Sequence, residues 1–157
     1  MSAKQQTFPL ANPDQTCALA RRLGAALRAG DTLLLSGGIG AGKTHFARCL
    51  IQSLLIEPED VPSPTFTLVQ VYDTKAGALW HSDLYRLSGP DDVVELGLPE
   101  AFDEAICLVE WPDKLEDLAP VNALNLAFRD GPDEDARLLT IAWTDARWST
   151  LIAGLMA

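Results

Sequence analysis

A glycine-rich segment between Thr32 and Thr44 constrains the fold more than any other part of this chain. A run of three leucines leads into the letters GGIGAGKT, which fit the pattern G-x-x-x-x-G-K-[ST]. Glycines permit backbone conformations in which successive N–H groups surround one phosphate, and a following helix adds its positive end. Apolar residues at helical spacing do follow the glycines. The segment therefore predicts a phosphate-binding loop between a buried strand and an amphipathic helix.

We expect this loop to hold the phosphates of a nucleotide together with Mg²⁺. Lys43 is predicted to reach the β- and γ-phosphates, and the hydroxyl of Thr44 is predicted to ligate Mg²⁺. The residues predicted to contact the nucleotide at this loop are Gly38, Ile39, Gly40, Ala41, Gly42, Lys43 and Thr44. The alternative is a glycine-rich turn that binds nothing, but a lysine directly after the last glycine is hard to explain in that way. No Asn-Lys-x-Asp segment is present to recognise guanine, which favours ATP over GTP.

The length and charge of the chain limit what else it can be. Its 157 residues predict a single domain spanning 1–157. A formal net charge of -10 argues against tight nonspecific binding of nucleic acid, because few basic groups can displace counterions from phosphates. No apolar run is long enough to cross a bilayer, and the polar first residues do not resemble a secretory signal. We therefore expect a cytoplasmic protein with no membrane contact.

The three cysteines are predicted to be buried thiols. Cys17, Cys49 and Cys107 lie within apolar patterns, and none has the C-x-x-C spacing of a metal or redox motif. Because a reducing compartment keeps thiols unpaired, we prefer free thiols to a disulfide or a metal site. His45 and His81 are too isolated in the sequence to suggest a zinc pair.

The remaining periodicity and turn residues predict helices and strands in alternation. The predicted elements are a helix that starts after Asn12 and stops near Gly30, strands at 66–72 and 78–84, short helices at 90–96 and 99–103, a strand at 105–110, strands at 123–129 and 137–143, and a last helix capped by Thr144. The strands at 66–72 and 78–84 are separated by a loop that suits a β-hairpin. We predict a single-domain α/β P-loop NTPase fold, with a central sheet that is mixed because of this antiparallel insertion and is flanked by helices.

Two carboxylates are candidates for work beside the loop. Glu110 ends an apolar run typical of a strand buried on both faces, and Asp83 ends another strand-like run. P-loop enzymes need such a carboxylate to hold Mg²⁺ or to orient water. We predict Lys43, Asp83 and Glu110 as catalytic residues, and Thr44 and Glu110 as metal ligands. The alternatives are a polar strand terminus for Glu110 and a loop cap for Asp83.

Thr65 is a further candidate contact to the nucleotide. It lies between the loop helix and the hairpin, where nucleotide switches often place a segment that senses the γ-phosphate. Hydroxyl groups that cap a local turn are an equally good explanation of this segment.

Four blocks of the sequence carry a resemblance to a known family. In order they are GGIGAGKT at 37–44, VPSPTFTLV at 61–69, HSDLYRL at 81–87 and ICLVEWP at 106–112. Together they resemble the TsaE family of bacterial P-loop ATPases, once called YjeE. Lys43 and Thr44 match the family's nucleotide and Mg²⁺ residues, and Glu110 its metal-linked carboxylate. Asp83 matches its second functional acid and Trp111 its adjacent tryptophan.

The chain departs from the family's pattern at two positions. Gly38 stands where the family usually has aspartate, and Ser82 stands where it usually has an aromatic residue. The first departure is expected to loosen the loop or remove a local hydrogen bond. The second is expected to alter the packing beneath Asp83.

The resemblance implies a function in tRNA modification. It implies Mg²⁺-dependent ATP hydrolysis, weak without partners, that supports a complex of TsaD and TsaB proteins in forming N6-threonylcarbamoyladenosine at position 37 of tRNAs reading ANN codons. tRNA is then contacted only through that complex. One alternative is a small-molecule kinase with Asp83 as base and Arg86 on the phosphates. Another is a binding module in which ATP changes the affinity for a partner.

Overall fold

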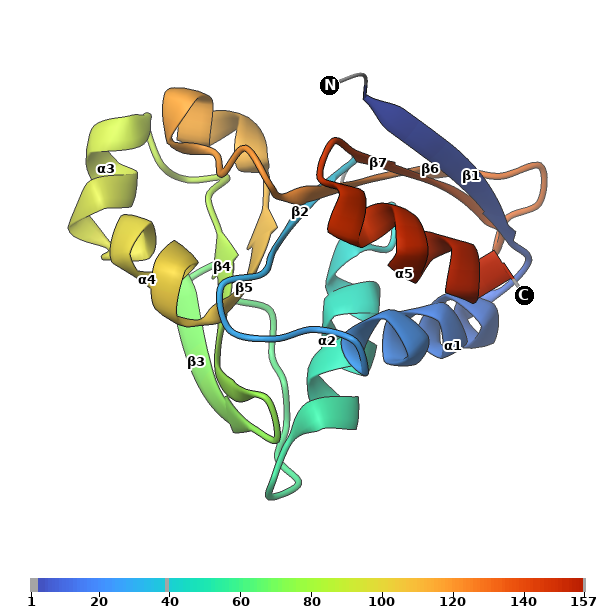
Figure 1. The fold of residues 1–157 in the computed structure, drawn as a ribbon, viewed down its shortest axis with the longest axis horizontal. Helices are drawn as coiled ribbons and strands as arrows, with labels where there is room; N and C mark the ends of the chain where they lie inside the picture. The colour runs from blue at the N-terminus through green and yellow to red at the C-terminus, as the bar shows by residue number, and fades with distance from the viewer. Residues whose placement is uncertain (1–2, 39, 157) are drawn as a thin grey trace.

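The computed structural model describes residues 3–38 and 40–156, which form one seven-stranded sheet with helices on both faces (Figure 1). The strands are β1 (Lys4–Leu10), β2 (Thr32–Ser36), β3 (Val69–Thr74), β4 (Gly77–Asp83), β5 (Ile106–Glu110), β6 (Leu124–Asp130) and β7 (Arg137–Trp143). The helices are α1 (Pro13–Gly24), α2 (Lys43–Leu54), α3 (Pro90–Glu95), α4 (Leu98–Glu104), α5 (Ala146–Met156) and the 3₁₀ helix η1 (Pro112–Leu118).

The sheet has the strand order β1-β7-β6-β2-β5-β4-β3, and it is mixed as predicted. Strand β2 runs parallel to β5 and β6, and β4 runs parallel to β5. The β3–β4 hairpin, the β6–β7 hairpin and the β1–β7 pair are antiparallel. Because the carboxyl ends of parallel strands lie at one edge, the loop after β2 meets Asp83 and Glu110, the last residues of β4 and β5, at that edge.

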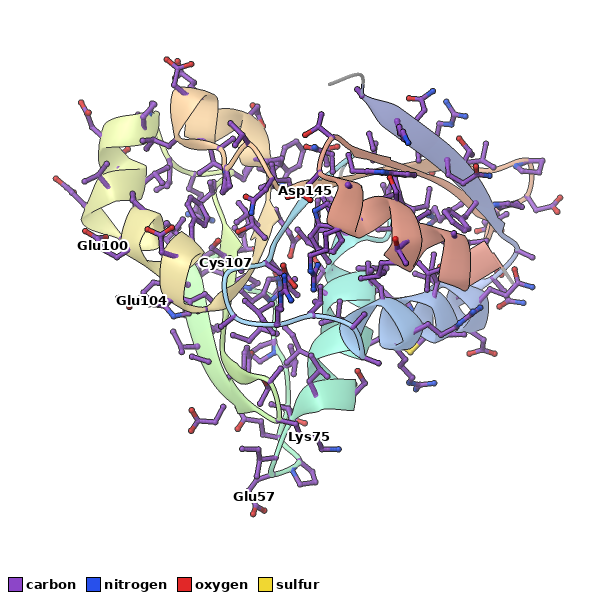
Figure 2. All side chains as sticks on the ribbon, in the orientation of Figure 1. Glu57, Lys75, Glu100, Glu104, Cys107 and Asp145 are labelled. Carbon is purple, nitrogen blue, oxygen red and sulfur yellow. A yellow bond between two sulfur atoms is a disulfide. The ribbon has the colours of Figure 1, made fainter. Side chains whose placement is uncertain are left out.

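Alternate residues of the central strands face two hydrophobic cores. On β2, Leu33 and Leu35 belong to the core formed with α1, α2 and α5, whereas Leu34 belongs to the core formed with α3, α4 and η1. On β5, Leu108 faces the first core and Cys107 faces the second, where it lies inside the molecule (Figure 2). Both faces of these strands are therefore covered, which explains their continuous apolar sequences.

Strand β1 has no counterpart among the predicted elements. It pairs antiparallel with β7 along its whole length, with Lys4 opposite Trp143 and Leu10 opposite Arg137. Most of its side chains are exposed or partly exposed, so it carries no strong apolar alternation. The strand exists because its backbone N–H and C=O groups pair with an edge of the sheet, and this pairing depends on tertiary structure.

The first helix begins as predicted, with the Asn12 Oδ1 accepting a hydrogen bond from the Gln15 N–H at 2.9 Å. It ends at Gly24 rather than near Gly30, because hydrogen bonds that span three residues tighten the chain there, from the Leu27 N–H to the Gly24 carbonyl among others. The helix therefore covers less of the chain than its periodicity indicated.

Two other predicted boundaries also shift. Strand β3 begins at Val69 rather than at residue 66, because a turn precedes it in which the Leu68 N–H donates to the Pro64 carbonyl. At α5 the first-turn hydrogen bond is made by Asp145, whose Oδ1 accepts from the Arg147 N–H at 2.9 Å, whereas the hydroxyl of Thr144 donates to the distant Val121 carbonyl.

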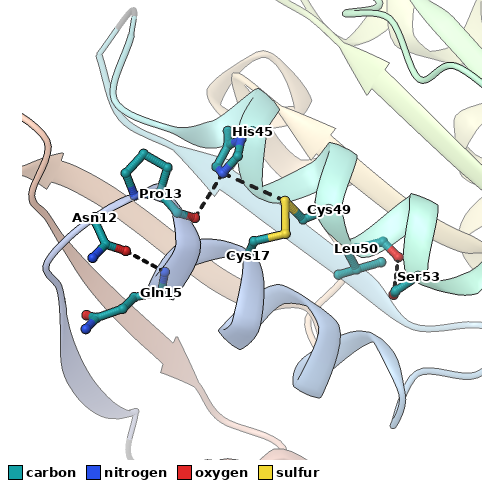
Figure 3. The surroundings of a disulfide bond; sticks show 8 residues. All are labelled: Asn12, Pro13, Gln15, Cys17, His45, Cys49, Leu50 and Ser53. Carbon is teal, nitrogen blue, oxygen red and sulfur yellow. Dashed lines mark hydrogen bonds between the residues drawn. A yellow bond between two sulfur atoms is a disulfide. The ribbon is translucent and has the colours of Figure 1, made fainter.

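The prediction of three free thiols is wrong for two of them. Cys17 on α1 and Cys49 on α2 form a disulfide (Figure 3). The two residues are 32 positions apart in the sequence, and only the packing of α1 against α2 brings their Cα atoms to 5.2 Å. Cys107 is a free, buried thiol as predicted, and burial raises its pKa to about 12.

No helix in the described ranges 3–38 and 40–156 has the length and apolar character needed to cross a membrane.

Candidate functional site

The predicted phosphate loop connects β2 to α2 at the carboxyl edge of the sheet. Gly37 has a φ of +138°, and a Cβ atom there would lie only 2.5 Å from the carbonyl oxygen of Phe128. Gly42 precedes the first residue of α2 with a φ of +108°. Both positions therefore require glycine. Ile39, one of the predicted nucleotide contacts, lies outside the described residues.

The loop is also held from the far side by Arg137, at the start of β7. Its Nε donates to the Ala41 carbonyl and its Nη2 donates to the Gly40 carbonyl, each at 3.1 Å. These bonds occupy two loop carbonyls with a cation, and they place a positive charge next to the loop. No pattern in the sequence predicts this contact, because Arg137 lies almost a hundred positions from the loop and begins an ordinary strand.

Lys43, the first residue of α2, is 5% exposed and lies at the mouth of the loop. Its Nζ donates to the Gly37 carbonyl at 2.8 Å and lies 3.4 Å from the centroid of the Trp111 ring. Burial lowers the pKa of this ammonium group, and the nearby carboxylates of Glu110, Asp83 and Asp113 oppose the shift. Trp111 thus does more than pack beside Glu110, since its ring face contacts the lysine.

Thr44 and Glu110 are in direct contact. The Thr44 hydroxyl donates to Glu110 Oε1 at 2.8 Å, and the carboxylate is only 2% exposed. The other carboxylate oxygen, Oε2, lies 2.7 Å from Nε2 of His81, which is fully buried on β4. Glu110 therefore has one hydrogen-bond partner on each oxygen, and its position is fixed from two sides.

His81 was not predicted as a site residue; in the sequence it was considered only as half of a zinc pair and as the first residue of the block HSDLYRL. It lies two residues before Asp83 on the same strand, so both side chains face the same side of the sheet. A histidine at a buried strand position, two residues before a candidate acid, is the signal that would have identified it.

Asp83 is the register partner of Glu110 on the neighbouring parallel strand. Its Oδ2 accepts from the Thr65 hydroxyl at 3.2 Å, and its Oδ1 accepts from the Tyr85 N–H at 2.9 Å. The structure thus joins Thr65 to the site through Asp83, and Thr65 also contacts the Ser63 hydroxyl at 2.7 Å. Both of the interpretations considered for this segment, a site contact and a hydroxyl-capped turn, fit these bonds.

Two clefts open beside the loop and share the residues Gly40, Lys43 and Thr44. One, of about 220 Å³, is bounded by the candidate acids, Thr65 and Trp111. The other, of about 290 Å³, lies on the α1 side and is bounded by Pro13, Thr16, His45 and Arg137. Gly40, Lys43 and Thr44 therefore lie beside Thr65, Asp83 and Glu110 around the first cleft. Gly42 lines only the second cleft, and the predicted contacts Gly38 and Ala41 line neither of the two.

The two departures from the family pattern fall in different surroundings. A Cβ atom at Gly38 would meet no atom of the described chain within 4 Å, so glycine is not required there by space. Ser82 is fully buried on β4, and its hydroxyl has no hydrogen-bond partner among the described residues. Neither departure removes a side chain that contacts Lys43, Thr44 or Glu110.

The site can be tested for fit to Mg²⁺ by its donor atoms. The described residues contain no group of three or more histidine, cysteine, aspartate or glutamate side chains arranged to hold a metal. Mg²⁺ in nucleotide sites typically uses one or two carboxylates, waters and the phosphates rather than an all-protein cage. The touching oxygens of Thr44 and Glu110 fit that kind of site, because both are hard oxygen ligands.

The fold and the site define an α/β protein of the P-loop class. A family model described as "Threonylcarbamoyl adenosine biosynthesis protein TsaE" matches residues 10–139. A relative from Rickettsia felis, named tRNA threonylcarbamoyladenosine biosynthesis protein TsaE, is 39% identical over 150 residues, which cover 94% of this chain and 85% of that protein. A protein of the same name from Bacillus subtilis is 36% identical over 149 residues, covering 94% of this chain and 92% of the relative.

A solved structure agrees with these similarities. The crystal structure of Bacillus subtilis YdiB superposes with a TM-score of 0.78 at 30% sequence identity, over 99% of this chain and 97% of that one. The chain therefore belongs to the TsaE family of threonylcarbamoyl adenosine biosynthesis proteins.

Proposed function

We propose that this chain is a Mg²⁺-dependent ATPase that supports a complex of TsaD and TsaB proteins in forming N6-threonylcarbamoyladenosine at position 37 of tRNAs reading ANN codons. Family membership supports the role in this biosynthesis. The observation that supports ATP hydrolysis most directly is the contact between Thr44 and Glu110 beside the loop, because it pairs the hydroxyl and the carboxylate that such chemistry needs.

The residues of the chain take separate roles in this proposal. The backbone N–H groups of the loop and the ammonium of Lys43 bind the phosphates and stabilise the charge that develops on the transferred group. Thr44 and Glu110 hold Mg²⁺, directly or through water, and the bound ion neutralises phosphate charge. Asp83 positions the attacking water, and Thr65 reports the state of the γ-phosphate through its hydrogen bond to Asp83.

His81 and Arg137 support these roles by holding the groups that face the nucleotide site. His81 holds Glu110 Oε2 at 2.7 Å, which fixes the carboxylate while its other oxygen faces Thr44. Arg137 fixes two loop carbonyls, so the loop is already formed when a nucleotide arrives. Residues that only orient other groups in this way are positioning residues rather than catalytic ones.

A small-molecule kinase is less well supported by the geometry. Asp83 would accept the proton of an acceptor hydroxyl in that reaction, and its oxygens, which accept from Thr65 and from the Tyr85 N–H, keep lone pairs for a hydroxyl as well as for water, so Asp83 does not separate the two functions. Arg86, the candidate for binding phosphates in that reading, lies over the ring of Phe66 instead, with its Cζ 4.4 Å from the ring centroid.

The proposal is tested by measuring ATP hydrolysis with Mg²⁺, alone and with TsaD, TsaB and tRNA, while modified adenosine is counted. We expect slow hydrolysis alone, faster hydrolysis with the partners, and many modified tRNAs for each partner complex. The Lys43→Ala variant should lose hydrolysis, because the charge is removed from the phosphate site. It should stay folded with a lower melting temperature, because it also loses the bond to the Gly37 carbonyl and the contact with Trp111. The proposal would be refuted if the hydrolysis rate did not change when TsaD, TsaB and tRNA were added, or if the Lys43→Ala variant hydrolysed ATP at the normal rate.

A further inference from the structure

The Cys17–Cys49 disulfide lies next to the second cleft of the site. Cys49 is on α2, the helix that begins at Lys43, and Cys17 follows Thr16, which lines the 290 Å³ cleft. Figure 3 shows the bond joining the two helices close to Pro13 and His45, which line the same cleft. The disulfide is therefore a covalent link between the P-loop helix and the opposite wall of that cleft.

The two ends of α1 are held in different ways. At its C-terminal end, Leu23 is fully buried and Gly24 packs closely on α2, where a Cβ atom would lie 3.0 Å from Leu50 Cγ. At its N-terminal end Thr16 is buried, but Pro13 is exposed and Cys17 is only partly buried. Apolar packing thus fixes the end that is far from the cleft, whereas the disulfide acts on the end that forms the cleft wall.

His45 connects the disulfide to the cleft wall. Its Nε2 lies 3.1 Å from the Pro13 carbonyl oxygen and 3.8 Å from the sulfur of Cys49 (Figure 3). One imidazole nitrogen thus touches both the first residue of α1 and the disulfide. A movement of Cys17 away from Cys49 changes the surroundings of this nitrogen and the position of the wall at Pro13.

We propose that Cys17 and Cys49 form a thiol–disulfide exchange site whose oxidised state holds a nucleotide in the neighbouring cleft more tightly than its reduced state. The coupling rests on the proposed function, because it requires that a nucleotide occupy this region. Oxidation fixes the wall formed by Pro13 and Thr16 against α2, so less conformational freedom remains to be lost when the ligand binds.

The oxidant in this exchange is a low-molecular-weight disulfide such as oxidised glutathione. The Cys17 thiolate, which is the more accessible of the two, attacks that disulfide and releases one glutathione thiolate. The Cys49 thiolate then attacks the Cys17 sulfur and releases the second. The two protons lost by the cysteines end on the two glutathione thiols, so the protein is oxidised by two electrons and the glutathione disulfide is reduced by two. A dithiol reverses the reaction.

The experiment uses the full chain in both redox states. One sample is treated with oxidised glutathione and another with dithiothreitol, and free thiols are counted by alkylation and mass spectrometry. Mg²⁺ and ADP are then titrated by calorimetry. We expect an about 5-fold lower Kd in the oxidised sample, which corresponds to roughly 1 kcal/mol. Re-reduction of the same sample should restore the weaker binding.

Two variants and one native residue serve as controls. Cys17→Ser and Cys49→Ser should both bind ADP with the affinity of the reduced wild type, whichever reagent is used. Cys107 should stay unmodified in the folded chain in every sample, because it is fully buried in the opposite core. If a serine variant does not fold, the reversible change in the wild-type sample still decides the question.

The outcomes separate this inference from the proposed function. ADP affinities within about 2-fold in the two states would refute the coupling and leave the nucleotide site intact. Alkylation of Cys17 and Cys49 after treatment with oxidised glutathione would also refute the inference, because it would show that no disulfide had formed. No ADP binding in either state would refute both the nucleotide site and the coupling that rests on it. A reversible 5-fold difference, absent in both serine variants, supports the inference.

Discussion

Replacing Glu110 with glutamine tests whether the buried carboxylate serves the reaction or the fold. The substitution keeps the shape of the side chain but removes its charge. One oxygen can still accept from the Thr44 hydroxyl. The new amide group faces His81 Nε2, which can become an acceptor if its proton moves to Nδ1. That move breaks no bond, because Nδ1 has no hydrogen-bond partner in the part of the chain that the structure describes.

The expected change in stability is small because two effects oppose each other. Two charge-assisted hydrogen bonds of roughly 1.5–3 kcal/mol become neutral bonds of roughly 0.5–1.5 kcal/mol, a loss of about 2–3 kcal/mol. The charged carboxylate of Glu110 is 2% exposed, so the folded wild type bears a desolvation penalty of several kcal/mol that the neutral amide avoids, and this gain opposes the loss. The net change in the free energy of unfolding is then within about 2 kcal/mol, a shift of less than about 8 °C in Tm for a domain of this size.

The expected change in activity is large. Loss of the carboxylate removes an oxygen ligand or orienting group for Mg²⁺, so the Mg²⁺ concentration for half-maximal hydrolysis should rise by about 10- to 100-fold. Scanning calorimetry and a Mg²⁺ titration of ATP hydrolysis measure the two quantities. Glu100→Gln on α4 is the matched control, because it removes the same charge from a carboxylate that is exposed (Figure 2). Unchanged Mg²⁺ dependence in Glu110→Gln would refute the assignment, and a large loss of Tm would show that the carboxylate serves the fold.

Two further predictions concern the loop and the core. Gly37→Ala should lose about 2–5 kcal/mol of stability, because its Cβ would lie 2.5 Å from the Phe128 carbonyl oxygen at a strained φ. Gly38→Ala should melt like the wild type, because a Cβ there meets no described atom within 4 Å and φ is not positive. Equal Tm values for the two variants would contradict this. Burial raises the pKa of the Cys107 thiol from 9.0 to about 12, so between these pH values the thiol ionises in the unfolded chain but not in the folded one. The contribution of this thiol to the free energy of unfolding is therefore complete below pH 9 and is lost as the pH rises toward 12. The free energy of unfolding of the oxidised chain, measured in urea, should fall by up to about 1.4 kcal/mol for each pH unit above 9 relative to that of Cys107→Ala. Parallel pH profiles of the two proteins would contradict this.

Much of the site could be read from the sequence because its parts are local. The loop needs glycines, a lysine and a threonine at fixed spacing between a strand and a helix, and all of these lie within thirteen consecutive residues, from Thr32 to Thr44. Glu110 and Asp83 were identified because each ends an apolar run, and the ends of parallel strands meet at one edge. The helix start at Asn12 followed from a capping pattern that spans four residues.

What the sequence alone could not determine depends on contacts between distant segments. Strand β1 exists because its backbone pairs with β7, and backbone pairing leaves little trace in side-chain pattern. The contact of Arg137 with the loop joins β7 to the segment between β2 and α2, and the contact of His81 with Glu110 joins two neighbouring strands. The disulfide joins Cys17 and Cys49 only because α1 packs on α2. The order of residues therefore determined the local chemistry of the loop, whereas the packing of helices and strands decided which side chains support that loop, because such contacts form only after distant segments meet.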